Sequence, residues 1–279
     1  MLRDITIGQY YDVDSVVHKL DPRTKIIATV VYIVSLFCVK NILGFALAGI
    51  GLLTAVKLAR IPLKFILRGL KTIMVLLLFT VVLNIFLVDG TPIVKWGFIS
   101  ISKEGIYTAV FMAARLVLLI IGCSMMTLTT TPIQLTDGIE RLLRPLKKIK
   151  VPVHDIAMMM SIALRFIPIL LEETDKIMKA QTARGADFES GGLVQKAKSL
   201  IPVLVPLFIS AFRRADELAT AMEARCYHGD EGRTRMKELK YRTRDYVAKA
   251  CLLVFLLGLI LSRYLPSVTS IGAFFLSKW

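Results

Sequence analysis

The chain has 279 residues, 55% of which are hydrophobic, and it carries a formal net charge of +15 at pH 7. Its mean hydropathy is +0.64. Soluble globular domains of this size rarely combine such apolar character with such a basic balance, so the composition excludes an ordinary soluble protein. Apolar stretches alternate with basic ones along the chain. This alternation predicts a membrane protein with basic loops, and it explains the high pI without a nucleic-acid ligand.

Five apolar stretches predict membrane-spanning helices, since a bilayer core about 30 Å thick needs roughly 20 apolar residues in a helix. They cover residues 26–39, 42–59, 72–88, 106–128 and 245–265. Asp21 and Pro22 form a strong helix start before the first stretch, as N-cap and first-turn residues. Asp245 opens the last one. We therefore predict an all-α polytopic membrane protein with about five transmembrane helices.

Two further apolar stretches, at residues 156–171 and 200–212, are shorter, and each contains Arg or Pro. Stretches of this length more often lie at the membrane interface or pack on other helices than cross a bilayer alone. We expect them to belong to helices that do not span the membrane.

The distribution of Lys and Arg predicts the orientation of the chain. With a cytoplasmic N-terminus and five alternating spans, 30 of the 36 Lys and Arg residues fall inside the cell, 5 fall outside, and Arg115 lies within a span. Cytoplasmic loops carry an excess of these residues, and the short loop 60–71 agrees with the longer segments. We expect a multi-pass protein of the plasma membrane with its N-terminus in the cytoplasm.

The spans divide the chain into three segments. Residues 1–130 form an N-terminal membrane domain, residues 131–245 a cytoplasmic region of long amphipathic helices, and residues 246–279 a C-terminal transmembrane helix. Thr131 and Gln134 form a capping box with Pro132 between them, which predicts a helix start. An apolar stripe then continues to Leu146, and Pro152 marks the end of that helix.

The cytoplasmic region contains an internal repeat with an offset of 41 residues. The offset places Asp175 on Asp216 and Arg184 on Arg225, and the apolar stripes of the two helices coincide. Each helix ends in an arginine between small residues. The two ends are Ala183-Arg184-Gly185 and Ala224-Arg225-Cys226, and we expect Asp175 and Asp216 to support the helices behind them.

Two interpretations of these arginines are open from the sequence. In the first interpretation the ends are docking groups, because small neighbours allow a partner to approach the backbone while the guanidinium binds carboxylates. An arginine at a helix C-terminus also complements the negative end of the helix dipole, which is a purely structural role. The duplication favours docking, because two equivalent ends imply two equivalent sockets on a dimeric or pseudo-dimeric partner.

A few other side chains are candidates for function. Arg115 and Asn84 are strongly polar and lie inside predicted spans. An intramembrane arginine is functional by default, but a helix–helix hydrogen bond is the more frequent role of such a group. Met158, Met159 and Met160 could form an adaptable patch that contacts a membrane partner, or they could pack as ordinary apolar residues.

Catalysis and metal binding are not expected. The chain lacks a G-x-x-x-x-G-K-[ST] phosphate loop, and its three histidines lie far apart. The four cysteines contain no C-x-x-C pair, so they predict neither a zinc site nor a disulfide framework. An autonomous secondary transporter would carry its repeat and its ionisable residues within the membrane, whereas this repeat lies in the cytoplasmic region. An intramembrane enzyme would need clustered acids or ligands that the spans lack.

Several motifs resemble those of a known family, in order and spacing. They are residues 18–25 (HKLDPRTK), 128–132 (LTTTP), 163–168 (ALRFIP), 181–187 (QTARGAD) and 221–227 (AMEARCY). The chain resembles the transmembrane T component of energy-coupling factor importers, which is related to the transmembrane protein of cobalt-uptake systems. The resemblance extends from about residue 15 to 230.

The resemblance implies a division of labour. Two cytoplasmic ATP-binding subunits would bind ATP and magnesium, this chain would hold no cofactor, and a separate membrane protein, the S component, would bind the vitamin or metal. The ends at Ala183–Gly185 and Ala224–Cys226 would dock on the ATPases, and Met158–Met160 could contact the S component. Cys226 departs from the family's usual glycine. Because cysteine adopts a positive φ less readily, we expect the second end to have a slightly different backbone conformation.

Overall fold

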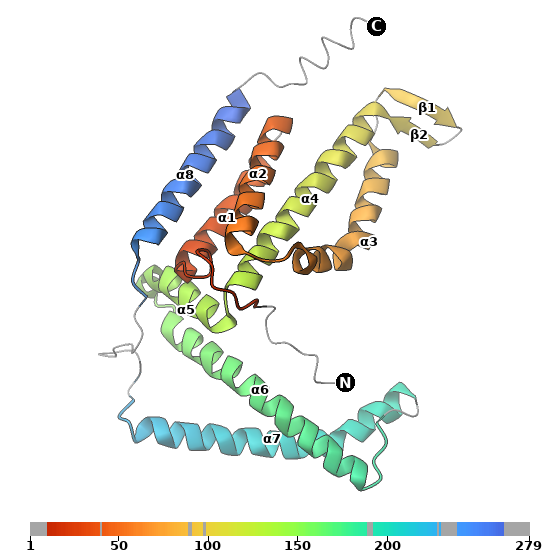
Figure 1. Cartoon of the computed structure of the whole chain (residues 1–279). Helices are drawn as coiled ribbons and strands as arrows, with labels where there is room; N and C mark the ends of the chain where they lie inside the picture. Colours follow the sequence, from red (N-terminus) through yellow and green to blue (C-terminus); the bar gives the residue numbers. More distant parts are fainter. Residues whose placement is uncertain are drawn as a thin grey trace, which may run out of the picture. The chain divides into compact units, whose positions relative to one another are not determined.

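The structure, a computed structural model, describes residues 10–39, 41–88, 91–96, 99–188, 192–227, 229 and 239–264. Helices dominate it (Figure 1). The α-helices are α1 (Pro22–Cys38), α2 (Ile42–Ala59), α3 (Leu63–Leu87), α4 (Lys103–Thr129), α5 (Pro132–Leu143), α6 (Val153–Ala183), α7 (Leu193–Glu223) and α8 (Thr243–Tyr264). A 3-10 helix, η2 (Arg144–Ile149), follows α5, and the strands β1 (Pro92–Trp96) and β2 (Ile99–Ser102) pair as an antiparallel hairpin between α3 and α4.

The helices confirm the predicted all-α class, to which the short hairpin is a local addition. By length and composition, five described helices could cross a membrane: Ile42–Ala59, Lys103–Thr129, Val153–Ala183, Val194–Glu223 and Thr243–Ser262. A sixth candidate is the pair Lys64–Lys71 and Ile73–Leu87, which is bent by 58°. The sequence also predicted about five membrane-spanning helices, but they are not the same five.

Residues 156–171 and 200–212 belong to helices that are longer than the apolar stretches themselves, and by length and composition both helices could cross a membrane. They lie within α6 and α7, which have 31 residues each. Pro168 lies inside α6, and Pro202 and Pro206 lie inside α7, so none of them ends a helix. A proline within a helix removes one backbone hydrogen bond, and flanking turns with intact bonds can continue the helix on both sides. Composition therefore predicted the breaks in apolarity but not the helix lengths.

The chain divides into two compact units. One contains Gly8–Gly138 and Leu239–Trp279, so the N-terminal membrane helices and α8 belong together. The other contains Ile139–Glu238, with η2, α6 and α7. The predicted boundary at residue 131 lies before the division between Gly138 and Ile139. The predicted boundary at residue 245 lies after the division between Glu238 and Leu239.

In the first unit, α1, α2, α3, α4 and α8 pack on one another (Figure 1). Its main apolar cluster joins α2 and the start of α3 to the end of α4. The buried members are Leu52, Val56, Ala59, Ile61, Ile66, Met125 and Leu128. Gly122 of α4 faces the Tyr32 ring of α1 so closely that an added Cβ would lie 2.6 Å from a ring carbon. The backbones of α1 and α4 can therefore approach each other only because Gly122 lacks a side chain.

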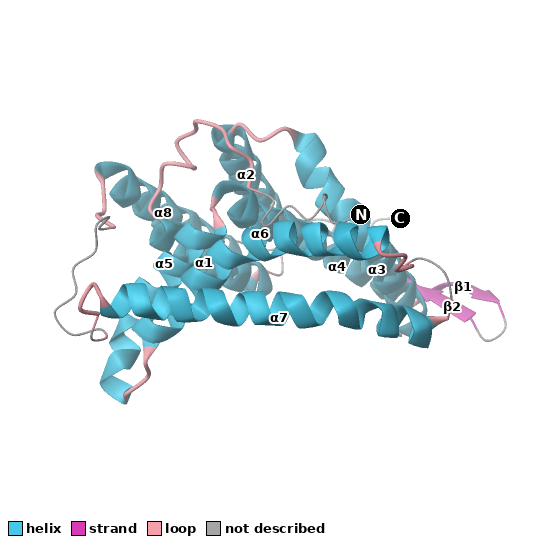
Figure 2. Ribbon diagram, turned by 90° about the horizontal axis from the view of Figure 1, so that it is seen from below, coloured by secondary structure: helices cyan, strands magenta, loops and turns pink. Residues whose placement is uncertain are grey.

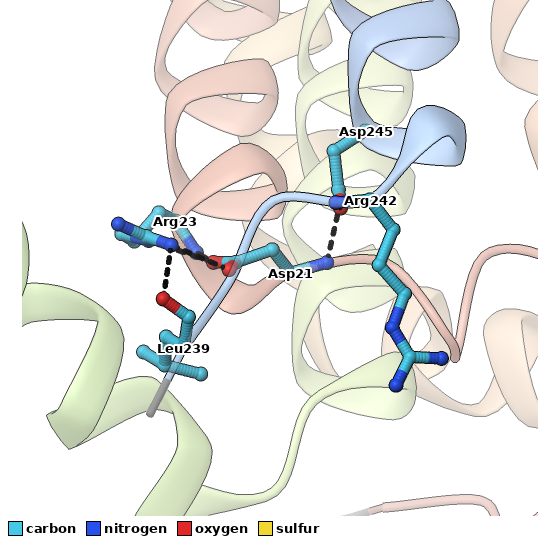
Figure 3. A network of polar contacts seen from close by, with 5 residues as sticks. All are labelled: Asp21, Arg23, Leu239, Arg242 and Asp245. Carbon is cyan, nitrogen blue, oxygen red and sulfur yellow. Dashed lines mark hydrogen bonds and ion pairs between the residues drawn. The ribbon is translucent and has the colours of Figure 1, made fainter. Parts of the chain in front are cut away.

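A network of charged groups joins the start of α1 to the start of α8 (Figure 3). Asp21 is the predicted N-cap of α1, and its Oδ1 accepts from the Arg23 backbone N–H at 2.9 Å. The Arg23 guanidinium donates to Asp21 Oδ2 at 2.8 Å and to the Leu239 carbonyl at 3.1 Å. Burial alone raises the pKa of the Asp21 carboxyl, but the Arg23 hydrogen bonds outweigh it and hold the pKa below its ordinary value.

Asp245 completes this network from α8. Its side chain is almost fully buried, and its Oδ1 accepts from the Asp21 backbone N–H at 2.8 Å. Its Oδ2 accepts from the Arg242 backbone N–H, also at 2.8 Å, as the third residue of a capped helix does. A single carboxylate thus satisfies two backbone donors, one on each of two chain segments.

Lys25, also in the first turn of α1, contacts the end of α4. Its ammonium group donates to the Thr129 carbonyl at 2.7 Å and to the His18 carbonyl at 3.1 Å, and the residue is only 6% exposed. A cation at the last turn of α4 complements the negative end of that helix. The predicted capping box is present at the start of α5. There Thr131 and Gln134 exchange hydrogen bonds of 3.3 and 3.4 Å.

Replacing Asp245 with alanine should destabilise the first unit, which contains α1 to α4 and α8. Two backbone donors would lose their acceptor, which costs about 2–3 kcal/mol in the free energy of unfolding and lowers the melting temperature by roughly 5–10 °C. Thermal unfolding of the detergent-solubilised protein measures this. Asp14→Ala is the control, because that side chain is 89% exposed and forms one surface ion pair with Lys19. Equal shifts for the two variants would contradict the proposed importance of the network.

Candidate functional site

The first predicted arginine end lies where α6 terminates. Gly185 has φ of 89°, in the left-handed region that glycine adopts without strain. Its N–H donates to the Thr182 carbonyl at 2.9 Å, and the Ala186 N–H donates to the Gln181 carbonyl at 3.0 Å. This pair of bonds is the Schellman motif, in which a left-handed residue ends a helix and satisfies its last carbonyls. Arg184 is the cap residue.

The second end repeats this hydrogen-bond pattern at the same 41-residue offset. Cys226 has φ of 55°, its N–H donates to the Glu223 carbonyl at 2.8 Å, and the Tyr227 N–H donates to the Met222 carbonyl at 3.1 Å. Arg225 therefore precedes its left-handed residue as Arg184 does, although the C-cap of α7 is Ala224. The backbone conformation at the second end differs slightly, as expected, since φ is 55° at Cys226 and 89° at Gly185, but cysteine still adopts the left-handed region despite its Cβ.

The side chains at both ends face away from the chain. Ala183, Arg184, Gly185, Ala224, Arg225 and Cys226 are all exposed. A Cβ built on Gly185 would meet no atom within 4 Å. Neither guanidinium has a hydrogen-bond or ion-pair partner among the described residues. Backbone N–H groups already occupy carbonyls of each last turn, so the arginines are not needed to cap their own helices.

The helices α6 and α7 pack on each other within the second unit and run in opposite directions (Figure 2). Glu173 of α6 accepts from the Arg214 guanidinium at 3.3 Å and from the Ser210 hydroxyl. Further along, the Gln181 side chain donates to the Pro202 carbonyl at 3.4 Å. Along α6 these contacts run from residue 173 to residue 181, and the contacted residues of α7 run in the reverse direction, from 210 to 202. This is an antiparallel crossing.

The crossing occurs at equivalent positions of the repeat, since Glu173 and Arg214 are themselves 41 residues apart. Each arginine end lies 11 residues beyond its crossing residue, which is about 16 Å along a helix. Because the helices are antiparallel, Arg184 and Arg225 extend to opposite sides of the crossing, as the ends of α6 and α7 do in Figure 1.

The residues predicted to support the helices take no part in this contact. Asp175 is half-buried and Asp216 is exposed, and neither carboxylate has a partner among the described side chains. The contact uses Glu173 instead. The sequence contains a signal for this contact, because Glu173 and Arg214 carry opposite charges at equivalent positions of the repeat.

Arg115 of α4 serves as a link between helices. Its guanidinium donates to the carbonyl of Val39, the C-cap of α1, at 3.0 Å. It also lies 5.9 Å from the centre of the Phe37 ring and 5.6 Å from that of Phe45. This contact is a helix–helix hydrogen bond, the more frequent role of an intramembrane arginine. The Asn84 amide donates within its own helix, to the Thr80 carbonyl at 2.8 Å.

The three methionines lie near the start of α6. Met158 is half-buried, whereas Met159 is 58% exposed and Met160 is 49% exposed. Within the described ranges, no three His, Cys, Asp or Glu side chains gather in a way that could hold a metal ion.

Comparison with known proteins identifies the family. The model of the CbiQ family, described as cobalt transport protein, matches residues 14–236. The "Energy-coupling factor transporter transmembrane protein EcfT" of Clostridium kluyveri is 59% identical over 265 residues, which cover 94% of this chain and 98% of that relative. The proteins of the same name from Ruminiclostridium cellulolyticum and Bacillus subtilis are 58% and 48% identical, over 95% and 92% of this chain and 99% of each relative.

The family match spans both units of the structure and includes both arginine-capped helix ends. The identities extend over nearly the whole length of each relative. The chain therefore belongs to the CbiQ family, and it is a transmembrane component of energy-coupling factor transporters.

Proposed function

We infer that this chain transmits ATP hydrolysis by two separate cytoplasmic ATPases to a membrane protein that binds a vitamin or metal, the S component. The observation that carries the inference is the pair of matched helix ends. Each presents an arginine that has no partner among the described residues, beside a left-handed residue with the same hydrogen-bond pattern, at opposite sides of one crossing. Two equivalent cationic ends fit two equivalent acidic sockets, as a pair of like subunits would offer.

The chemistry of docking follows from the guanidinium group. Its planar fork of donors binds a carboxylate with two parallel hydrogen bonds, which fixes direction as well as distance. Small residues on both sides of each arginine leave room for a partner to reach the backbone. ATP and magnesium would be bound by the ATPases, so this chain would contribute no group to hydrolysis and would act as a mechanical link.

Coupling would use the crossing of α6 and α7 as a fulcrum. When the ATPases close around ATP, their sockets approach, and the arginine ends move relative to each other. Since each end is joined by a continuous helix to the crossing, the movement changes the angle between α6 and α7. Exposed apolar side chains of α7, such as Phe208 and Phe212, would carry the S component and reorient it. In this arrangement the N-terminus and both arginine ends face the cytoplasm.

Removing the arginines should weaken assembly with the ATPases. Loss of one partner from a buried charge pair costs about 3–5 kcal/mol, or roughly 10²–10³-fold in affinity. Arg184→Ala and Arg225→Ala should each reduce ATPase co-purification from membranes, and the double variant most. Arg213→Ala and Lys179→Ala are matched controls, because both cations are exposed on the same helices and lie outside the two ends.

The control variants should retain normal amounts of ATPase. If the double variant yields a complex with undiminished ATPase content, the docking role is excluded. If the control variants lose as much ATPase as the double variant, general positive charge rather than the two ends accounts for assembly.

Cys226→Gly tests whether the second end needs only a small residue. Glycine adopts φ of 55° without the steric cost that a Cβ brings, so the variant should bind ATPase as tightly as the parent and be about 1 kcal/mol more stable. Gly185→Cys, the reciprocal change, should retain docking with a similar loss of stability. Titration of detergent-solubilised variants with ATPase measures both, and a tenfold loss of affinity in Cys226→Gly would instead indicate that the thiol contacts the partner.

A further inference from the structure

The connection from α5 to α6 carries a basic surface that ATPase docking does not use. It consists of the end of α5 and the 3-10 helix η2, followed by Lys150 with φ of 62°. A concavity of about 520 Å³ opens on it. The lining residues are Arg141, Arg144, Pro145, Lys147 and Lys148.

Three of the four cations on this surface have no acidic partner among the described residues. None of the lining residues is acidic, and Arg141, Arg144 and Lys148 have no carboxylate partner within the part of the chain that the structure describes. The neighbouring acid, Glu140, lies 3.1 Å from the His154 ring nitrogen, and its side chain is only 14% exposed. Cations crowded in this way repel one another, so an external anion would lower the energy of the surface.

Apolar side chains alternate with these cations. Leu143 is 40% exposed, Leu146 is 38% exposed and Ile149 is 76% exposed. Since a 3-10 helix has three residues per turn, Leu146 and Ile149 lie on one ridge of η2, and Arg144 and Lys147 form a basic ridge beside it. An apolar ridge next to a basic ridge is typical of segments that lie in a membrane interface.

The position of this surface in the chain points to the same environment. It begins about a dozen residues after α4 ends at Thr129, and α4 is long and apolar enough to cross a membrane. Cations that close to the end of a span lie near the cytoplasmic leaflet, where anionic lipids attract them. A soluble acidic protein would match the cations but would leave the apolar ridge unexplained.

We propose that the α5–η2 surface binds the headgroups of anionic phospholipids in the cytoplasmic leaflet, with Ile149 in the interface. Arg141, Arg144 and Lys148 contact the phosphates, and the apolar ridge enters the acyl boundary. Each cation near such a surface strengthens the interaction by roughly fivefold. The site does not include Arg184 or Arg225, so it can fail without affecting ATPase docking, and the reverse also holds.

The test places a fluorescent reporter on the ridge. The full-length Ile149→Trp variant is reconstituted in vesicles that contain either phosphatidylglycerol or phosphatidylcholine, each brominated in the upper part of the acyl chain. The tryptophan emission of the parent chain, measured in the same vesicles, is subtracted. Brominated phosphatidylglycerol should quench the added tryptophan at a mole fraction at least tenfold lower than brominated phosphatidylcholine. Arg141→Gln, Arg144→Gln and Lys148→Gln together should abolish this preference, because three cations contribute roughly a hundredfold.

A matched control neutralises three exposed lysines elsewhere in the same unit, Lys179, Lys196 and Lys198, and it should keep the preference. Equal quenching by the two lipids, or a preference that survives the triple change at the proposed site, would overturn the proposal. Glycerol phosphate added to the solution separates the two sources of phosphate. If it abolishes the preference at millimolar concentration, the surface binds free phosphate esters and not the bilayer.

Discussion

The antiparallel crossing of α6 and α7 is the constraint on which the proposed site depends. Glu173 holds Ser210 and Arg214 there, and Glu173 and Arg214 occupy equivalent positions of the repeat. A repeat that crosses itself at equivalent residues must carry its equivalent ends to opposite sides. The geometry of Arg184 and Arg225 is therefore a consequence of this contact, and the Schellman motifs only fix the direction in which each arginine leaves its helix.

In the first unit, side chains in the first turn of α1 hold other segments of the chain by hydrogen bonds. Lys25 holds the Thr129 carbonyl, close to the point where the chain leaves this unit, and Arg23 holds the Leu239 carbonyl, where the chain returns. Asp245 joins the same turn to α8 through the Asp21 N–H. Both connections to the α6–α7 unit are thus anchored by adjacent side chains of one helical turn.

Sequence reasoning succeeded where the determining interaction is local. Asp21 caps α1, Thr131 and Gln134 form their capping box, and the 41-residue repeat extends to the hydrogen bonds of both helix ends. It failed where distant residues or competing terms decide. Asp245 contacts a residue 224 positions away, which no local pattern indicates. The lengths of α6 and α7 depend on turns around internal prolines, and Cys226 adopts a conformation that its residue type disfavours.

Site-specific cross-linking tests the central claim most directly. A photo-reactive residue placed at Thr182 or at Glu223 lies next to one arginine end, and these positions are equivalent in the repeat. In membranes that contain the assembled transporter, each position should cross-link to one ATPase subunit, and a chain labelled at both should capture two. Cross-links to lipid, or to a single ATPase subunit from both positions, would contradict an account in which two equivalent ends dock on two equivalent sockets.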